Sequence, residues 1–427
     1  MKETMIQLTP VPTERAILIG LINRESSKAL VEEHLEELER LASTAGAITV
    51  FKIVQDKDRP DSAYFLGKGK AEEVKQLIEF NDIQLVIFDD DLNPTQSRNL
   101  EKLFERKILD RSGLILDIFA SHAKTREAKT QVELAQLQYM LPRLTRAWTH
   151  LSKQYGGIGT KGPGETQIET DRRIIRTRIG KLKEILRKIE SQQVIKSAQR
   201  HEQLTACLVG YTNAGKSTLL NRLTDAGVLA EDKLFATLDS TTRVFDIEKK
   251  KKIMLSDTVG FIRKLPHHLV ASFKSTLNVV RDADIILHVI DISHDYFEDH
   301  INVVDSTLKE LDCRDKLQIK VFNKVDLLKE KDRIDYVLNK YGKSIVISAG
   351  RGINIGSLRK VMLELYAKNF IEKTITLDPG ESKIVALLYE LAEVTSVKYG
   401  EDKITVNYKA TAAIHDKIER MRKQECG

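Results

Sequence analysis

The chain has few cysteines, no long apolar run and no repeated or low-complexity tract. Cys207, Cys313 and Cys426 are scattered without metal-ligand spacing, so we expect reduced thiols and not a disulfide framework or a zinc site. Every apolar run is shorter than a membrane span, and the N-terminus lacks the apolar core of a signal peptide. These absences predict a soluble, cytoplasmic protein without membrane insertion.

Length and charge set broad limits on organisation and partners. A chain of 427 residues is long enough for two to four domains with sizeable cores. The net charge is +6 and the isoelectric point is about 8.9. This mild positive excess permits a nucleic-acid partner without demanding one. We expect the protein to be a monomer.

Residues 1–110 alternate between apolar runs typical of strands and segments with helical periodicity. Strands are predicted at 16–22, 48–54 and 85–88, with a helix at 27–41. This alternation predicts an α/β domain with a parallel sheet. The turn Gly67-Lys68-Gly69-Lys70 precedes a helix that starts near Ala71. It is either an ordinary turn with solvated lysines or a helix N-terminus that binds phosphate.

Residues 111–200 predict a helical hairpin. Its first helix carries the apolar stripe Leu134, Leu137, Leu141 and Leu144, and its second carries Ile175, Ile179, Leu182, Leu186 and Ile189. The opposite face of the second helix is basic, through Arg172, Arg173, Arg176, Arg178, Lys181, Lys183, Arg187 and Lys188. Between the helices lies a glycine-rich stretch, residues 155–165, which is too long for a tight turn.

The basic face of this hairpin has two interpretations. Charged helix faces are usually only solvated. Here one face carries mostly one sign, beside a lysine-tipped, mobile glycine-rich loop with Tyr155 and the single Trp148 nearby. Glycine lets backbones approach closely, and RNA is often recognised by shape and stacking. We therefore favour a role in RNA contact.

Residues 201–368 contain a phosphate-binding loop between a short apolar run and a helical pattern. Gly210, four residues and then Gly215-Lys216-Ser217 match G-x-x-x-x-G-K-S. Such a loop directs successive N–H groups at phosphate oxygens, while the lysine reaches the β- and γ-phosphates and the serine hydroxyl binds Mg²⁺. The predicted nucleotide contacts of this loop are Gly210, Tyr211, Thr212, Asn213, Ala214, Gly215, Lys216, Ser217 and Thr218.

Three further stretches follow predicted strands of the same domain. They are Asp257-Thr258-Val259-Gly260, Asn323-Lys324-Val325-Asp326 and Ser348-Ala349-Gly350. Open α/β sheets bind ligands at such strand ends. The ordered set resembles the guanine-nucleotide motifs of translation-factor-like GTPases, with Asp326 as the residue that selects guanine over adenine by accepting from N1–H and the exocyclic amine.

The segment between the phosphate loop and Asp257 is placed like a switch that responds to the γ-phosphate. It runs from Phe235 to Arg243 and includes Ala236 and Thr237. We expect Thr242 to complete a Mg²⁺ shell with Ser217 and Asp257, the last acting through water, and the Gly260 N–H to contact the γ-phosphate. The catalytic residues predicted are Lys216, Thr242 and Gly260. Asn213 is either a cap of the loop or a ligand of K⁺.

Residues 369–427 predict a small α+β domain. Strands are expected at 374–377, 394–398 and 404–408, with helices at 382–392 and 410–422. Nothing in this βαββα pattern suggests catalysis, and we expect a docking or stabilising role. The predicted fold class is α/β, with an α/β domain at 1–110, a helical hairpin at 111–200, a central P-loop domain with a mostly parallel sheet at 201–368 and this α+β domain at 369–427.

Taken together, the chain resembles HflX-type ribosome-associated GTPases. The resemblance rests on the segments 114–119, 125–129 and 131–137, and above all on the glycine-rich loop 156–167. It implies binding to the large (50S) ribosomal subunit and its rRNA, and GTP-controlled splitting of stalled or idle ribosomes under stress. Ser240 stands where the family usually has proline, and we expect a slightly looser switch. The alternative function is a GTP-dependent regulator of a protein partner without RNA contact.

Overall fold

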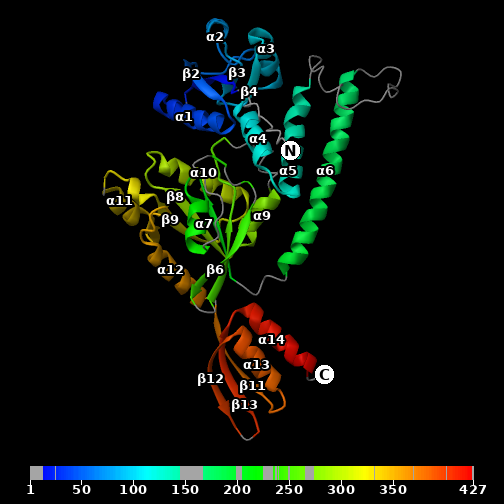
Figure 1. Ribbon diagram of the computed structural model, residues 1–427, viewed down its shortest axis with the longest axis vertical. Coiled ribbons are helices and arrows are strands. Elements are labelled where there is room, and N and C mark those ends of the chain that lie inside the picture. The colour runs from blue at the N-terminus through cyan, green and yellow to red at the C-terminus, as the bar shows by residue number, and fades with distance from the viewer. Residues whose placement is uncertain are drawn as a thin grey trace, which may run out of the picture. The chain divides into compact units, whose positions relative to one another are not determined.

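The computed structural model describes residues 13–24, 26–144, 167–198, 204–224, 234–235, 238, 240–248, 251–264, 274–330, 332–368, 370–400 and 402–425 (Figure 1). The chain forms two compact units. The first comprises Met1–Ile189, Ala230–Asp239 and Val259–Thr276, and the second comprises Glu190–Leu229, Ser240–Thr258 and Leu277–Gly427. Among the described residues no helix is long and apolar enough to cross a membrane.

The first unit contains a four-stranded parallel sheet in the order β2-β1-β3-β4. Its elements are β1 (Arg15–Ile22), α1 (Lys28–Thr44), β2 (Ile48–Asp56), α2 (Lys68–Phe80), β3 (Leu85–Phe88), α3 (Pro94–Phe104) and β4 (Lys107–Asp110). Strands β1 and β3 are buried almost throughout, because helices cover a parallel sheet on its faces. The parallel sheet predicted for this region is confirmed.

Three helices follow in chain order: α4 (Arg111–His122), α5 (Arg126–Met140) and α6 (Gln167–Ala198). Helix α5 packs against α6 through Leu134, Leu182 and Leu186. The first helix of the hairpin is shorter than predicted, because Leu141–Arg143 form a 3-10 turn (η1) and Leu144 lies beyond it. Pro142 explains this end, since proline has no N–H to donate to the carbonyl oxygen four residues earlier.

The second unit is built on a six-stranded sheet in the order β10-β9-β8-β5-β7-β6. Only β6 runs antiparallel to its neighbour among these described strands. Its elements are β5 (Thr205–Gly210), α7 (Lys216–Thr224), β6 (Thr241–Glu248), β7 (Lys251–Asp257), α9 (Lys274–Asp282), β8 (Ile285–Asp291), α10 (Phe297–Glu310), β9 (Leu317–Asn323), η3 (Val325–Leu327), α11 (Asp332–Tyr341), β10 (Ser344–Val346) and α12 (Ile355–Lys368).

The last part of the chain forms a separate antiparallel sheet in the order β11-β13-β12. The elements are β11 (Ile371–Leu377), α13 (Ser382–Leu391), β12 (Glu393–Tyr399), β13 (Ile404–Ala410) and α14 (Ala412–Glu425). Its core joins Leu377, Leu388, Val406, Tyr408 and Ile418. The predicted βαββα order is confirmed.

Candidate nucleotide-binding site

The phosphate loop connects the carboxyl end of β5 to the start of α7, as predicted. Two of its glycines have no room for a side chain. A Cβ on Gly210 would lie 2.2 Å from the Val289 carbonyl oxygen, and one on Gly215 would lie 2.3 Å from Asn323 Nδ2. Gly215 also has a φ of +90°, and Asn213 has a φ of +58°, a left-handed conformation that asparagine adopts more readily than most residues. The loop geometry therefore requires these residue types.

Lys216 is buried at the first position of α7. Its Nζ donates to the carbonyl oxygens of Gly210 at 3.1 Å and Tyr211 at 2.8 Å. Burial lowers the pKa of Lys216 to about 8, although the nearby carboxylate of Asp257 works in the opposite direction. A phosphate group beside this ammonium would raise that pKa again, because an adjacent negative charge favours the charged form.

Ser217, in the first turn of α7, and Asp257, at the end of β7, bring two side-chain oxygens together. Ser217 Oγ donates to Asp257 Oδ2 at 2.6 Å. Asp257 is fully buried, and its Oδ1 has no hydrogen-bond partner among the residues that the structure describes. Burial raises the pKa of Asp257, although Lys216, Ser217 and the Thr258 N–H lower it. Hydroxyl and carboxylate oxygens suit Mg²⁺, and the orphaned Oδ1 fits a water of its hydration shell.

The switch residues are described only in part. Thr242 lies in β6, where its hydroxyl is 2.8 Å from Ser256 Oγ. Thr258 donates its hydroxyl to the Leu208 carbonyl oxygen at 2.8 Å. Phe235 packs edge-on against Phe119 with ring centroids 4.8 Å apart. Val259 and Gly260 follow without regular secondary structure, and Ala236 and Thr237 fall outside the described residues.

The motif Asn323–Asp326 is joined to both the phosphate loop and the last motif. Asn323 donates from Nδ2 to the Ala214 carbonyl oxygen and accepts at Oδ1 from the Ala349 N–H, both at 2.9 Å. Lys324, with a φ of +64°, places its Nζ 2.8 Å from Asp291 Oδ2. Asp326 is partly exposed and lies 3.9 Å from Arg351 Nε. The loop Ser348-Ala349-Gly350 thus lies beside Asn323.

This geometry can be set beside known proteins. Family models match three consecutive stretches: "GTP-binding GTPase N-terminal" at residues 32–120, "GTP-binding GTPase Middle Region" at 122–200 and "50S ribosome-binding GTPase" at 205–324. GTPase HflX of Flavobacterium psychrophilum is 51% identical over 76% of this chain and 78% of its own length. GTPase HflX of Escherichia coli K12 is 42% identical over 91% of each chain.

The chain belongs to the HflX family of GTPases. It is accordingly a GTP hydrolase with a P-loop domain, and Mg²⁺ is the ion such domains typically use. A GTP-binding protein of Sulfolobus solfataricus, solved with GDP, is 26% identical with a TM-score of 0.45, over 83% of this chain and 99% of that one. The α/β fold and the family expected from the sequence are confirmed.

Two residues near the family's nucleotide motifs were not expected from the sequence. His300 on α10 stacks on Tyr211 of the phosphate loop, with ring centroids 3.7 Å apart and an interplanar angle of 8°. Arg222 on α7 donates from Nε to the Ala349 carbonyl oxygen and from Nη2 to that of Gly350. Neither residue belongs to a recognised motif, and their partners lie far along the chain. These two contacts could have been predicted only from the order of the strands in the sheet.

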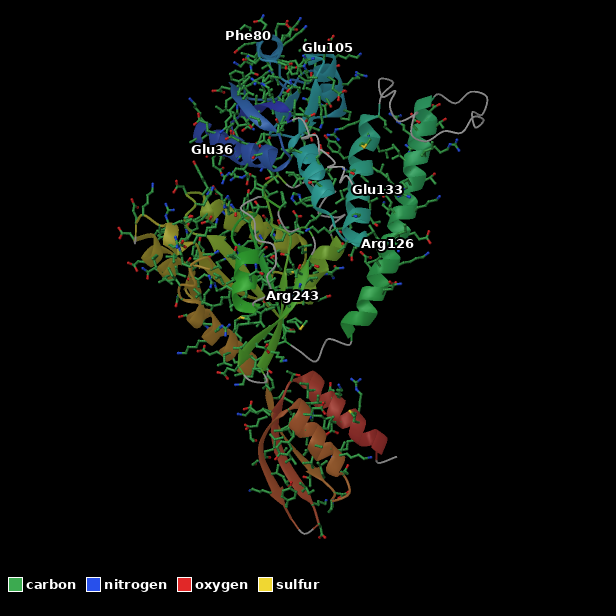
Figure 2. The ribbon with its side chains drawn as sticks, in the orientation of Figure 1. Glu36, Phe80, Glu105, Arg126, Glu133 and Arg243 are labelled. Carbon is green, nitrogen blue, oxygen red and sulfur yellow. The ribbon has the colours of Figure 1, made fainter. Side chains whose placement is uncertain are left out.

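The described part of the hairpin lies in the family's middle region. Arg178 donates from Nε and Nη2 to the two carboxylate oxygens of Glu133, at 2.6 and 2.9 Å. Glu133, on α5, is labelled in Figure 2. Of the other residues predicted for this basic face, Arg172 is half-buried and the rest, Arg173, Arg176, Lys181, Lys183, Arg187 and Lys188, are exposed. The glycine-rich stretch 155–165 and Trp148 fall outside the described residues.

Gly67 is the N-cap of α2, so Lys68, Gly69 and Lys70 lie in the first turn of this helix, which begins earlier than the start predicted near Ala71. The Gly67 N–H donates to Gln55 Oε1 at 2.9 Å, and Lys70 Nζ bonds Glu73 Oε1 at 2.7 Å. A Cβ on Gly67 would lie 3.1 Å from Gln55 Nε2, a tight contact that a small shift of the Gln55 side chain would relieve. These contacts favour the simpler interpretation, an ordinary turn at a helix start.

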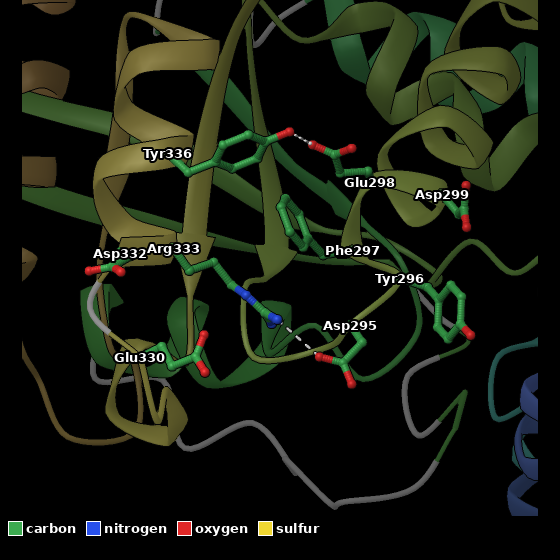
Figure 3. A pocket seen from close by; sticks show the side chains of 9 residues that line it. All are labelled: Asp295, Tyr296, Phe297, Glu298, Asp299, Glu330, Asp332, Arg333 and Tyr336. Atoms are coloured by element: carbon green, nitrogen blue, oxygen red, sulfur yellow. Dashed lines mark hydrogen bonds and ion pairs between the residues drawn. The ribbon is translucent and has the colours of Figure 1, made fainter.

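A cavity of about 510 Å³ opens at the N-terminal ends of α10 and α11 (Figure 3). Five carboxylates contribute to its lining: Asp295, Glu298, Asp299, Glu330 and Asp332. Arg333 is paired with Asp295 at 3.0 Å, and Tyr336 donates to Glu298 at 2.7 Å. Negative charge repels phosphate, so this cavity is not suited to the triphosphate of a nucleotide.

Proposed function

We propose that this GTPase binds the large (50S) ribosomal subunit through its rRNA and dissociates stalled or idle ribosomes in the cytoplasm, acting as a monomer. GTP hydrolysis to GDP would control its release. One family model is itself described as a 50S ribosome-binding GTPase. The observation that carries the proposal further is the exposed basic face of α6, which includes Arg173, Arg176, Lys183 and Arg187. RNA phosphates are the natural partners of such a face.

Co-sedimentation with large subunits, in a nonhydrolysable GTP analogue and at several salt concentrations, tests this proposal. We expect binding that weakens steeply with salt. A variant with Arg173, Arg176 and Lys183 replaced by alanine should bind less tightly, and the slope of log K against log[salt] should become shallower by about 2. Replacing the exposed Lys360, Lys368 and Lys373 removes the same charge elsewhere and serves as the matched control.

Three results would contradict the proposal in whole or in part. Binding that does not change with salt would indicate a protein partner without RNA contact. Equal weakening by the α6 variant and by the control variant would show that only total charge matters. If ribosomes stay intact in the presence of the wild-type protein and GTP, the proposed splitting activity is wrong, although binding to the large subunit could still hold.

Within the site we assign roles by chemistry. Lys216 would bind the β- and γ-phosphates, and the N–H groups of residues 210–218 would hold the phosphate oxygens. Ser217 and Thr242 hydroxyls, with Asp257 through water, would hold Mg²⁺, which neutralises charge that develops on the phosphates. Gly260 would contact the γ-phosphate. Asn323, Lys324, Asp326 and the loop 348–350 would hold guanine.

We assign the same site a K⁺ requirement through Asn213. Its side-chain carbonyl oxygen would be a ligand, and the ion would supply positive charge where other GTPases insert an arginine. The left-handed backbone at Asn213 gives a competing, purely local reason for this residue. GTP turnover in matched K⁺ and Na⁺ buffers, for the wild type and Asn213→Asp, separates the two. Equal turnover in both buffers would leave Asn213 a conformational residue.

A further inference from the structure

Arg222 links the helix after the phosphate loop to the loop at residues 348–353. It lies in the last turn of α7. Its Nε donates to the Ala349 carbonyl oxygen at 3.1 Å, and its Nη2 donates to the Gly350 carbonyl oxygen at 2.7 Å. A Cβ on Gly352 would lie 3.7–3.9 Å from atoms of the same guanidinium. One planar group therefore bonds two residues of the loop and lies near a third.

The loop itself is closed by its own backbone. Ser348 and Ile353 exchange N–H···O bonds of 3.1 and 3.0 Å, and the Arg351 N–H donates to Ser348 Oγ at 3.1 Å. Gly352 has a φ of +74°, which closes the turn in a conformation that favours glycine. Because the Ala349 N–H is bonded to Asn323, the loop is fixed at one end by Asn323 and at its centre by Arg222.

Because peptide groups are planar, the hydrogen bonds from Arg222 to the Ala349 and Gly350 carbonyl oxygens also fix the direction of the N–H groups in the same planes. In a trans peptide, the C=O and the N–H of one plane point in opposite directions. The Ala349 carbonyl faces Arg222, so the Gly350 N–H in the same plane points away from Arg222. The Gly350 carbonyl also faces Arg222, and the Arg351 N–H in that plane points to Ser348 Oγ. Arg222 thus fixes which way the loop presents its donors.

We propose that Arg222 is a positioning residue for guanine recognition. By holding these peptide planes, it would present the N–H groups of the loop, that of Gly350 foremost, to the O6 acceptor of guanine. Adenine has an amino group at that position, and two facing donors repel. The inference rests on the GTP hydrolase activity of the family and is independent of the ribosome.

Diphosphate affinities test the assignment in the full chain. The wild type, Arg222→Ala and Arg222→Lys are compared by calorimetry for GDP, inosine diphosphate and ADP. Inosine shares O6 with guanine but lacks the exocyclic amine that Asp326 reads. For Arg222→Ala we expect GDP and inosine diphosphate to bind about tenfold more weakly, by the same factor, while ADP binding is unchanged. Arg222→Lys, with one donor group for two carbonyls, should be intermediate.

Turnover and stability distinguish positioning from a general loss of structure. The kcat of Arg222→Ala at saturating GTP should stay within about twofold of the wild type while KM rises. The control is Lys316→Ala, which removes a cation that also donates to a carbonyl oxygen, that of Ala283 at 2.6 Å. This pair precedes β8 and β9, at the amino ends of these strands, whereas the nucleotide motifs follow the carboxyl ends. The control variant should leave the GDP-to-ADP preference unchanged.

Two outcomes would overturn the assignment. A GDP affinity of Arg222→Ala within about twofold of the wild type would show that the loop needs no such support. Equal weakening of GDP and ADP, with a lower melting temperature, would show that Arg222 stabilises the fold and does not sort bases.

Discussion

Arg111 provides the sharpest test of the energetics of the first unit. It is 1% exposed at the start of α4, where Nη1 donates to Asp89 Oδ1 at 2.6 Å and Nη2 donates to Glu37 Oε2. Asp89 and Glu37 are themselves buried, at 1% and 4% exposure. Replacing Arg111 with methionine keeps the apolar volume but leaves two buried carboxylates without their shared cation.

The cost follows from what remains around those carboxylates. Breaking a buried ion pair by removing one partner typically costs 3–5 kcal/mol, roughly, because the other charge stays desolvated. Lys264 Nζ still lies 2.5 Å from Asp89, and Arg263 Nε lies 3.5 Å from Glu37, so we expect the lower end of that range. A loss of about 3 kcal/mol lowers the melting temperature of a unit this large by about 6–12 °C.

The pH dependence gives a second observable. Burial works to raise the pKa of Asp89, but Arg111, His34 and Lys264 outweigh it and hold this pKa well below its ordinary value. A carboxyl whose folded-state pKa is lowered stabilises the protein above its unfolded pKa of 3.8, and that contribution is lost as the pH falls further. Without Arg111, the folded-state pKa of Asp89 should rise towards its unfolded value, so the stability that the variant loses on acidification should be smaller than the loss in the wild type.

Chemical and thermal denaturation of Arg111→Met measure both effects. The control is Arg24→Met, which removes an ion pair of similar length, 2.7 Å to Asp58, whose side chains are 79% and 64% exposed. Exposed pairs contribute about 0–1 kcal/mol, so this variant should unfold like the wild type. If both variants lose less than about 1 kcal/mol, the reasoning from burial is refuted.

Three more predictions concern activity. Asp326→Asn should weaken GTP binding at least about tenfold and admit xanthine nucleotides, because the amide offers a donor to the altered base edge; unchanged GTP affinity would exclude Asp326 from base selection. Replacing Lys161 together with Gly162-Pro163-Gly164 should abolish ribosome splitting and spare nucleotide binding, and normal splitting by that variant would make the tip a mere connector. Phe261, 2% exposed, cannot orient water where many GTPases have glutamine, so single-turnover hydrolysis should be slow alone and at least about tenfold faster with large subunits; equal rates would refute activation.

Local patterns explain what could be predicted from the sequence. The phosphate loop, the strands before each motif and the βαββα order all depend on residues close in the chain, where glycine spacing and apolar periodicity carry the signal. The predicted end of the first hairpin helix was wrong for a related reason. Leu141 and Leu144 continue the apolar spacing, and that regularity obscured Pro142, which ends the helix at Met140.

Long-range contacts explain what could not be predicted. Glu33 and Glu37 lie on the buried face of α1, where charged residues are rarely found. Their cations come from distant positions: Arg111 is 74 residues from Glu37, and Arg263 is 230 residues from Glu33. No periodicity in α1 indicates such partners. The hydrogen bonds from Arg222 to the Ala349 and Gly350 carbonyl oxygens are equally long-range, at separations of 127 and 128 residues.

The buried carboxylates of the first unit pair with cations from two different places: one lies on a helix and the others lie on the turn after Gly260. This difference predicts which carboxylate would respond to a movement of that turn. Arg111 belongs to α4 and is fixed by its own helix. Arg263 and Lys264 belong to a turn that follows the Gly260 motif, and they bond Glu33 at 2.8 Å and both Asp89 and Asp90 at 2.5 Å. If that turn moves, Glu33 loses a partner within a buried site, whereas Asp89 keeps Arg111. Burial already raises the pKa of Glu33, so proton uptake by this carboxyl would offset part of the cost. A movement of this turn would therefore favour protonation of Glu33 more than protonation of Asp89.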